Sequence, residues 1–152
     1  MTEKIELKFK RLSGDFEDLE LHGYATAGSA GMDIRAAVKN DIILEQGKVL
    51  LVPTDLSVEI PAGYEIQVRP RSGLAAKHSI GILNSPGTID SDYRGEIKII
   101  LMNFGEQEFF IKRGERIAQL VLSKVYQAQI EEVKELKDSK RGSGGFGHTG
   151  RS

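Results

Sequence analysis

Hydrophobic and polar residues alternate along much of the chain, which is the pattern of half-buried β-strands. Near the N-terminus, Ile5, Leu7 and Phe9 lie on one side of an extended segment, and charged residues lie on the other side. The same alternation runs through residues 56–60 and 64–69, which flank a Pro-Ala-Gly turn sequence. These two segments therefore predict a β-hairpin.

Three further strands are expected in the second half of the chain, at residues 97–101, 109–111 and 117–122. Turn sequences rich in Gly, Asn and Glu separate them. Only residues 74–78 have the character of a helical turn. Many short strands with Gly and Pro between them predict an all-β fold, a jelly-roll-like sandwich or barrel with one short helix.

The composition changes near Lys137, where apolar residues become scarce and five of the 17 glycines follow within RGSGGFGHTG. We therefore expect a β domain over residues 1–136 and a flexible, Gly-rich C-terminal tail over residues 137–152. The stretch GSGGFG satisfies the dinucleotide pattern GxGxxG, but that pattern needs a strand before it and a helix after it. The alternatives are a disordered end and a lid in which Arg141 contacts phosphate and Phe146 stacks on a base.

The composition also excludes several classes of protein. The chain has no cysteine, so it has no disulfide, thiolate metal site or cysteine nucleophile. Its N-terminal segment is too charged for a signal peptide, and no apolar run approaches the roughly 20 residues that span a bilayer. The net charge of −1 provides no basic field for polymeric nucleic acid, although a single nucleotide needs only local charge. We expect a soluble, cytoplasmic protein with no membrane role.

Five short sequences, spread over most of the chain, carry the functional signal. They are AGMDIRA at 30–36, RPRSGLA at 69–75, GILNSPGTIDSDYRGE at 81–96, RGERIAQLVL at 113–122 and RGSGGFGHTG at 141–150. In this order and spacing they resemble the motifs of the homotrimeric dUTPase family. The resemblance implies a jelly-roll subunit, a homotrimer with shared active sites, and hydrolysis of dUTP to dUMP and pyrophosphate. Such an enzyme limits uracil entry into DNA and supplies dUMP for thymidylate synthesis.

The resemblance assigns the catalytic carboxylate to Asp90, which would hold and deprotonate the attacking water. An ordinary aspartate is a weak base for water, so positioning and charge neutralisation must supply most of the rate. The alternative from the residues alone is a turn-forming aspartate, because Ser91, Asp92 and a glycine follow. Arg35 and Asp92 are expected to serve structure or solvent contact.

The resemblance also assigns the triphosphate to polar and glycine positions of three motifs: Arg71, Ser72, Gly73, Gln119, Arg141, Ser143, Gly144 and Gly145. It implies Mg²⁺ as the cofactor, chelated by the phosphates and water with no direct protein ligand. Asp33 matches an aspartate near the metal-bound waters, and its alternative is a buried polar residue that fixes a strand end. The three histidines, His22, His78 and His148, are isolated, so surface or loop roles are expected for them.

Residues 84–93 resemble the family's uracil-binding β-hairpin, in which backbone groups and the Asn84 amide pair with the uracil edge. The substrate-binding positions Gly87, Thr88 and Ile89 belong to this hairpin, whose tight backbone leaves no space for the methyl group of thymine. Tyr93 matches a ring that packs on the sugar where a 2′-hydroxyl would project; its alternative is an ordinary buried strand aromatic. Phe146 would stack on the base when the tail closes.

Two other functions are compatible with part of this pattern. A dCTP deaminase resembles dUTPase in fold and also has an arginine-serine segment, but it uses a glutamate, and Glu96 is expected to face solvent. A regulatory binding protein could keep the nucleotide site without turnover, although Asp90 beside a triphosphate would then only repel it. His148 departs from the family, which usually has a small or hydroxyl residue there, and this affects only the details of tail closure.

Overall fold

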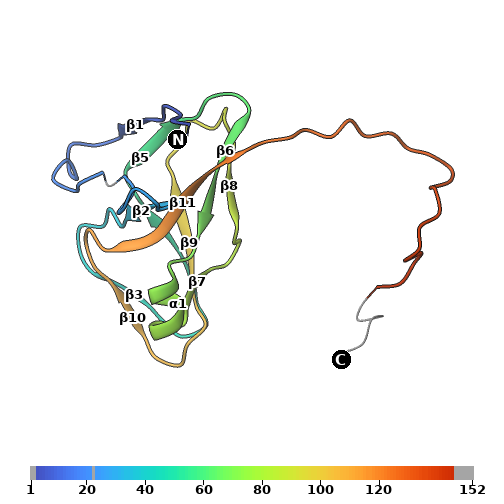
Figure 1. Cartoon of the computed structure of the whole chain (residues 1–152). Coiled ribbons are helices and arrows are strands. Elements are labelled where there is room, and N and C mark those ends of the chain that lie inside the picture. Colours follow the sequence, from blue (N-terminus) through green and yellow to red (C-terminus); the bar gives the residue numbers. More distant parts are fainter. Residues whose placement is uncertain (1–2, 22, 146–152) are drawn as a thin grey trace.

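The computed structural model describes residues 3–21 and 23–145 (Figure 1). Within these residues the chain forms eleven strands and one helix. The strands are β1 (Lys8–Arg11), β2 (Gly31–Arg35), β3 (Ile42–Leu44), β4 (Val49–Pro53), β5 (Leu56–Glu59), β6 (Tyr64–Arg69), β7 (Ile80–Ile82), β8 (Gly87–Ile89), β9 (Lys98–Asn103), β10 (Phe109–Ile111) and β11 (Arg116–Lys124), and the helix is α1 (Ser72–His78). The expected all-β fold with one short helix is therefore confirmed.

Every strand pair is antiparallel. The largest sheet has the order β2-β11-β6-β8, and a second sheet has the order β4-β9-β7. Two further pairs, β1 with β5 and β3 with β10, extend the body at its ends. Figure 1 shows these strands wrapped around one interior, with α1 close to β7, β3 and β10. No helix in the described part of the chain is long and apolar enough to cross a bilayer.

The hairpin expected at residues 56–69 is wrong as a pairing. The turn itself forms, because the backbone N–H of Tyr64 donates to the carbonyl of Pro61 at 3.2 Å. However, β5 pairs with β1, whereas β6 pairs with β11 and β8. Apolar residues on both strands are buried in the same core, so the turn carries the chain from one sheet to another.

The core is built from the inward-facing residues of both sheets. Val52 of β4, Ile66 of β6, Ile99 of β9 and Ile111 of β10 are fully buried in one continuous apolar cluster. Burying a side chain of this size contributes about 1.5–3 kcal/mol each. The core therefore fixes the sheet edges from which the polar residues of the site project.

Arg113, the first arginine of the fourth motif, holds the N-terminal loop against the body. Its guanidinium donates to both carboxylate oxygens of Asp18 at 2.7 Å and lies 5.2 Å from the centre of the Phe16 ring. The hydrogen bond from Arg113 lowers the pKa of Asp18 below its ordinary value. The Arg113 side chain therefore has a structural role: it contacts Asp18 and Phe16 of the N-terminal loop.

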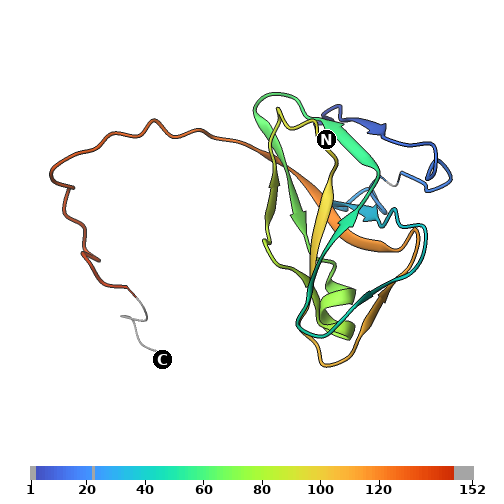
Figure 2. The ribbon, with the colours of Figure 1, turned by 180° about the vertical axis from the view of Figure 1, so that it is seen from behind.

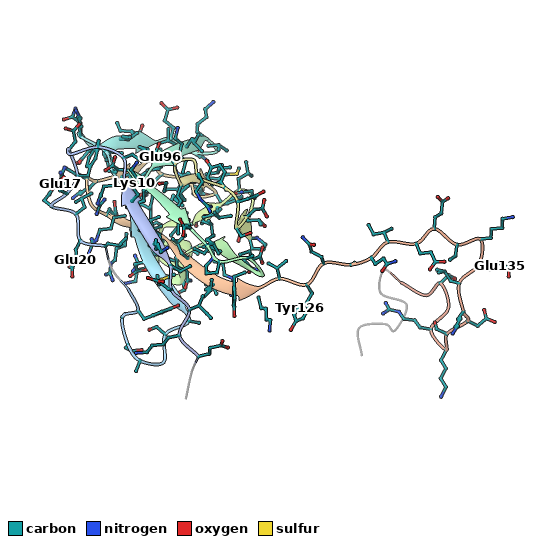
Figure 3. The ribbon with its side chains drawn as sticks, turned by 90° about the horizontal axis from the view of Figure 1, so that it is seen from above. Lys10, Glu17, Glu20, Glu96, Tyr126 and Glu135 are labelled. Carbon is teal, nitrogen blue, oxygen red and sulfur yellow. The ribbon has the colours of Figure 1, made fainter. Side chains whose placement is uncertain are left out.

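The last strand of the described residues ends at Lys124, and the chain then leaves the body as an extended arm, residues 125–145 (Figures 1 and 2). The backbone N–H of Val125 still donates to the carbonyl of Gly63 at 2.8 Å, but residues 126–143 are all exposed. Figure 3 shows Tyr126 near the start of the arm and Glu135 near the bend where the arm lies far from the body. Tyr126 and Ile130 are 85% and 92% exposed, so the arm presents large apolar side chains with no cover from its own body.

Candidate active site

A cavity of about 320 Å³ lies beside β8 and contains most of the residues expected to bind the nucleoside. Seven of its lining residues come from the third motif: Asn84, Gly87, Thr88, Ile89, Asp90, Tyr93 and Glu96. Apolar lining comes from Leu51 of β4, from Ile97 just before β9, and from Ile100 of β9. The cavity thus combines a polar rim with an apolar floor, which suits a flat heterocyclic ligand.

The polar rim is built on a single short strand. Gly87 of β8 is opposite Val68 of β6, and a Cβ on Gly87 would lie 3.1 Å from Nδ2 of Asn84 and 3.2 Å from Cβ of Val68. Glycine therefore lets the Asn84 amide lie against the strand. The segment is not a hairpin of two paired strands, since β7 pairs with β9 and β8 pairs with β6. Strand β6 supplies the hydrogen bonds that a hairpin partner would have given.

Asp90 follows directly after β8 and is exposed at the cavity. Its backbone carbonyl accepts a hydrogen bond from the N–H of Tyr93 at 3.2 Å, so a turn does form here. The turn uses only the backbone of Asp90, and the carboxylate is accessible to water and to a ligand. The structural and the chemical interpretations of this aspartate are therefore compatible.

Tyr93 is not the buried strand aromatic that was its alternative. Its side chain is 46% exposed, lines the cavity, and donates its hydroxyl to the backbone carbonyl of Glu96 at 2.9 Å. Glu96 differs from the sequence-based expectation, because it is only partly exposed and its Oε1 accepts from the backbone N–H of Asp55 at 3.0 Å. Glu96 thus has a structural role. Its partner Asp55 is distant in the sequence, so the residues around Glu96 did not predict this bond.

A second group of polar residues lies across the larger sheet. Asp33 of β2 is opposite Gln119 of β11, and Gln119 is opposite Arg69 of β6, so the three side chains lie in one row. The Asp33 carboxylate accepts from Nε of Arg71 at 3.1 Å and from Arg116 at 2.9 Å. Asp33 is therefore a partly exposed, doubly paired carboxylate, and its alternative as a buried strand-end residue is wrong.

Arg116, which contacts this row through Asp33, is a residue that sequence reasoning did not single out. It belongs to the fourth motif, and its partner Asp33 belongs to the first motif, 83 positions away. The Gln119 amide donates to the carbonyl of Pro70 at 2.9 Å, immediately before Arg71. These bonds gather the first, second and fourth motifs into one group.

Ser72 and Gly73 form the first turn of α1, beside Arg71 at its N-cap. No side chain caps this end of the helix, and both residues are exposed. Exposed N–H groups next to the Arg71 guanidinium provide an environment for an anion.

The two groups are well separated within one chain. Ile89 is opposite Ile66, whereas Gln119 is opposite Arg69, and two strand spacings separate β8 from β11. With about 3.3 Å per residue and about 4.8 Å between strands, the α-carbons of Ile89 and Gln119 are roughly 14 Å apart. Asp33 lies one strand further. The chain therefore does not bring its own Asp90 beside its own Asp33 and Gln119.

The tail residues are not brought to either group. Arg141 donates from Nε to the carbonyl of Gly144 at 2.7 Å, and Gly142 has a φ of 55° in the turn that they share with Ser143. These residues and Gly145 lie on the arm, away from the body (Figures 1 and 2). Phe146 and His148 lie outside the described residues, as does His22.

Metal ligation by the protein alone is not supported. Across residues 3–21 and 23–145, no three acidic or histidine side chains cluster so that they could hold an ion. Both oxygens of Asp33 are taken by guanidinium groups. His78 ends α1 with its ring packed on Phe109 at 5.3 Å. An ion chelated by phosphate oxygens and water would need no such cluster.

The fold and the two polar groups define a jelly-roll nucleotide-hydrolase class of protein. A family model described as dUTPase matches residues 17–150. The deoxyuridine 5′-triphosphate nucleotidohydrolase of Fusobacterium nucleatum is 53% identical over 148 residues, covering 97% of this chain and 99% of the relative. That of Brucella melitensis is 59% identical over 134 residues, covering 87% and 85%.

Solved structures agree with the sequence relatives. The dUTPase of Staphylococcus bacteriophage 80alpha with dUPNHPP has a TM-score of 0.85 and 28% identity, covering 96% of this chain and 99% of that one. The dUTPase of phage phi11, whose structure describes a structural Mg(II) ion, has a TM-score of 0.76 at 23% identity and shows the fold alone. This chain belongs to the dUTPase family.

Proposed function

We propose that this protein is a dUTP diphosphatase, which hydrolyses dUTP to dUMP and pyrophosphate in the cytoplasm. The observation that carries the proposal is the cavity in which Asn84, Asp90 and Tyr93 meet. The family relationship supports the same activity. The product dUMP would feed thymidylate synthesis, and removal of dUTP would limit uracil in DNA.

The proposed reaction is attack of water on the α-phosphorus. The water oxygen bonds to the α-phosphorus while Asp90 accepts a proton from that water. The bond from the α-phosphorus to the bridging oxygen breaks, which releases pyrophosphate. The exposed position of Asp90 next to the nucleoside cavity supports this role. The turn that fixes the Asp90 backbone supports the positioning on which so weak a base depends.

Selection of the base would depend on Asn84 and the backbone of β8. An amide fixed against Gly87 offers a donor and an acceptor in defined positions, so cytosine, with these reversed, would leave buried polar groups unpaired. Backbone groups of Thr88 and Ile89 in β8 would complete the contact, and their tight backbone would exclude a methyl group. Tyr93 would contact the sugar.

On the body, the triphosphate would be bound by Gln119 and, at the start of α1, by Arg71, Ser72 and Gly73. On the arm, it would be bound by Arg141, Ser143, Gly144 and Gly145. Phe146 would stack on the base. Mg²⁺, when chelated by the phosphates, would neutralise part of their charge. Asp33, whose two oxygens accept from Arg71 and Arg116, would lie near the water ligands of this ion. In this proposal residues 1–136 form the catalytic domain and residues 137–152 the lid.

We further propose that three copies assemble and share their sites. The separation of Asp90 from Asp33 and Gln119 supports this, because a second copy can supply its Asp33, Gln119 and Arg71 to the cavity of the first. Exposed apolar side chains support it too: Leu51, Leu83 and Phe104 on the body, and Tyr126 and Ile130 on the arm. A closed three-fold ring would cover such surfaces and join the two groups.

The activity is tested by incubating the protein with Mg²⁺ and, separately, dUTP, dCTP, dTTP and UTP. The expected result is dUMP and pyrophosphate from dUTP alone, measured by chromatography, because only uracil with deoxyribose fits both selective contacts. Ammonia release from dCTP would identify a deaminase instead. Binding of dUTP without turnover would identify a regulatory protein.

The shared site is tested by mixing two inactive variants. Asp90→Asn removes the proposed base, and Arg71→Ala removes the phosphate contact, so each variant alone should be inactive. If Asp90 and Arg71 come from different copies, co-refolded mixed trimers contain some intact sites. In a random one-to-one mixture about a quarter of the sites join both intact residues. Activity near this fraction is expected, and a mixture as inactive as its components would contradict the shared site.

A further inference from the structure

The ring of Tyr93 lies against the backbone of Gly95. A Cβ on Gly95 would be 2.4 Å from the Tyr93 hydroxyl oxygen and 2.6 Å from its Cζ. Both distances are below any that real Cβ atoms show, so the ring can occupy this position only because residue 95 has no side chain. The requirement is for space, in contrast to the turn glycines with positive φ elsewhere in the chain.

The hydroxyl of the same ring is held by a hydrogen bond to the backbone of Glu96. It donates to the backbone carbonyl of Glu96 at 2.9 Å. Glu96 cannot move freely, because its Oε1 accepts from the backbone N–H of Asp55 at 3.0 Å. The next residue is held as well, since the N–H of Ile97 donates to the carbonyl of Leu56 at 2.7 Å.

The segment that anchors Glu96 is part of the core. Thr54, Asp55 and Leu56 are buried, and the Thr54 hydroxyl donates to the carbonyl of Ile97 at 2.6 Å. Asp55 has a φ of 58°, an uncommon backbone conformation for a residue other than glycine, and bonds from surrounding residues hold it there. The segment 54–56 therefore holds Glu96, and through it Tyr93, in a fixed position (Glu96 is labelled in Figure 3).

We propose that Gly95 and Glu96 are positioning residues for sugar selection, which hold the Tyr93 ring so that it cannot retreat from a 2′-hydroxyl. This inference rests on the proposed function. A tyrosine that is 46% exposed and attached only at its Cβ would turn about its side-chain torsions when a larger sugar pressed on it. Contact with Gly95 on one side and the bond to Glu96 at the hydroxyl remove that freedom.

The first test compares Gly95→Ala with Gly28→Ala. A Cβ at Gly28 would meet nothing within 4 Å, and Gly28 contributes to neither polar group, so it is a matched control. The measurements are kcat/KM for dUTP and UTP, and Kd for the α,β-imido analogues of both. We expect Gly95→Ala to lower the preference for the deoxy compound at least about tenfold, both in the ratio of the kcat/KM values and in the ratio of the analogue Kd values. This is the scale of one hydrogen bond and one steric contact. Gly28→Ala should keep the wild-type preference.

The second test uses Glu96. Glu96→Ala removes the acceptor for the Asp55 N–H, whereas Glu96→Gln keeps an oxygen there. The preference should fall in the first variant and return in the second, which a general loss of stability would not produce. A folded Gly95→Ala or Glu96→Ala protein with the wild-type ratio would overturn the inference; should Gly95→Ala not fold, the Glu96 pair decides alone. Failure of the wild type to hydrolyse dUTP would refute the proposed function separately, since the analogue Kd ratios still report on Tyr93.

Discussion

Replacing Asp90 with Asn is expected to lower kcat for dUTP by about a thousandfold, within the range that general acid–base catalysis contributes. The amide keeps the size of the side chain and leaves the turn intact, since that turn uses the Asp90 backbone carbonyl. Ground-state binding should therefore survive, and removal of a negative charge near the triphosphate should, if anything, tighten it. Single-turnover kinetics and the Kd of the α,β-imido analogue of dUTP measure the two effects separately.

Asp92→Asn is the matched control for this change. Asp92 lies on the same turn and is exposed, but it does not line the cavity. Its substitution should leave kcat close to the wild-type value. Equal losses in both variants would show that the charge of the turn matters in general, and an Asp90→Asn enzyme with wild-type turnover would remove Asp90 from the mechanism.

Removing residues 141–152 is expected to lower kcat/KM for dUTP by about a hundredfold or more, the scale lost when positioning and exclusion of water fail. The deletion takes away Arg141, Ser143 and the glycines that follow them, but it keeps the apolar part of the arm around Tyr126 and Ile130. The oligomeric mass measured by light scattering should therefore not change. Removing only Arg151 and Ser152 provides a control with the lid residues retained.

The two readouts separate the possible roles of this segment. Full activity in the truncated protein would show that it is not a lid. A fall in mass to that of one chain would show instead that the end of the arm holds the copies together, and the loss of activity would then have a different cause.

The sequence pattern predicted the strands better than their partners. Alternation at residues 64–69 and 117–122 reports which side chains face the core, and both segments are strands in the structure. It does not report which strand lies alongside, because hydrogen bonding between strands is not encoded in the side-chain period. The turn at Pro61 and Gly63 therefore predicted a hairpin, whereas the chain passes there from one sheet to another.

The candidate site was predictable to the extent that it is local. Asn84, Asp90 and Tyr93 lie within one short segment, and the structure places all three at one cavity. The pairs Asp33 with Arg116 and Glu96 with Asp55 join residues far apart in the chain, and no single motif contains both members. Such contacts depend on the register of the folded strands, and only the structure supplies that register.

The extended arm has a consequence for how the protein behaves on dilution. If copies assemble as proposed and cover Tyr126 and Ile130, which are exposed in the single chain, then stability and assembly become linked by mass action. Specific activity should then fall at low protein concentration, more steeply than for an enzyme with a complete site in each chain. Newly released arms would also be the first segments open to proteolysis, so the cell's supply of subunits would set both the activity and the lifetime of the enzyme.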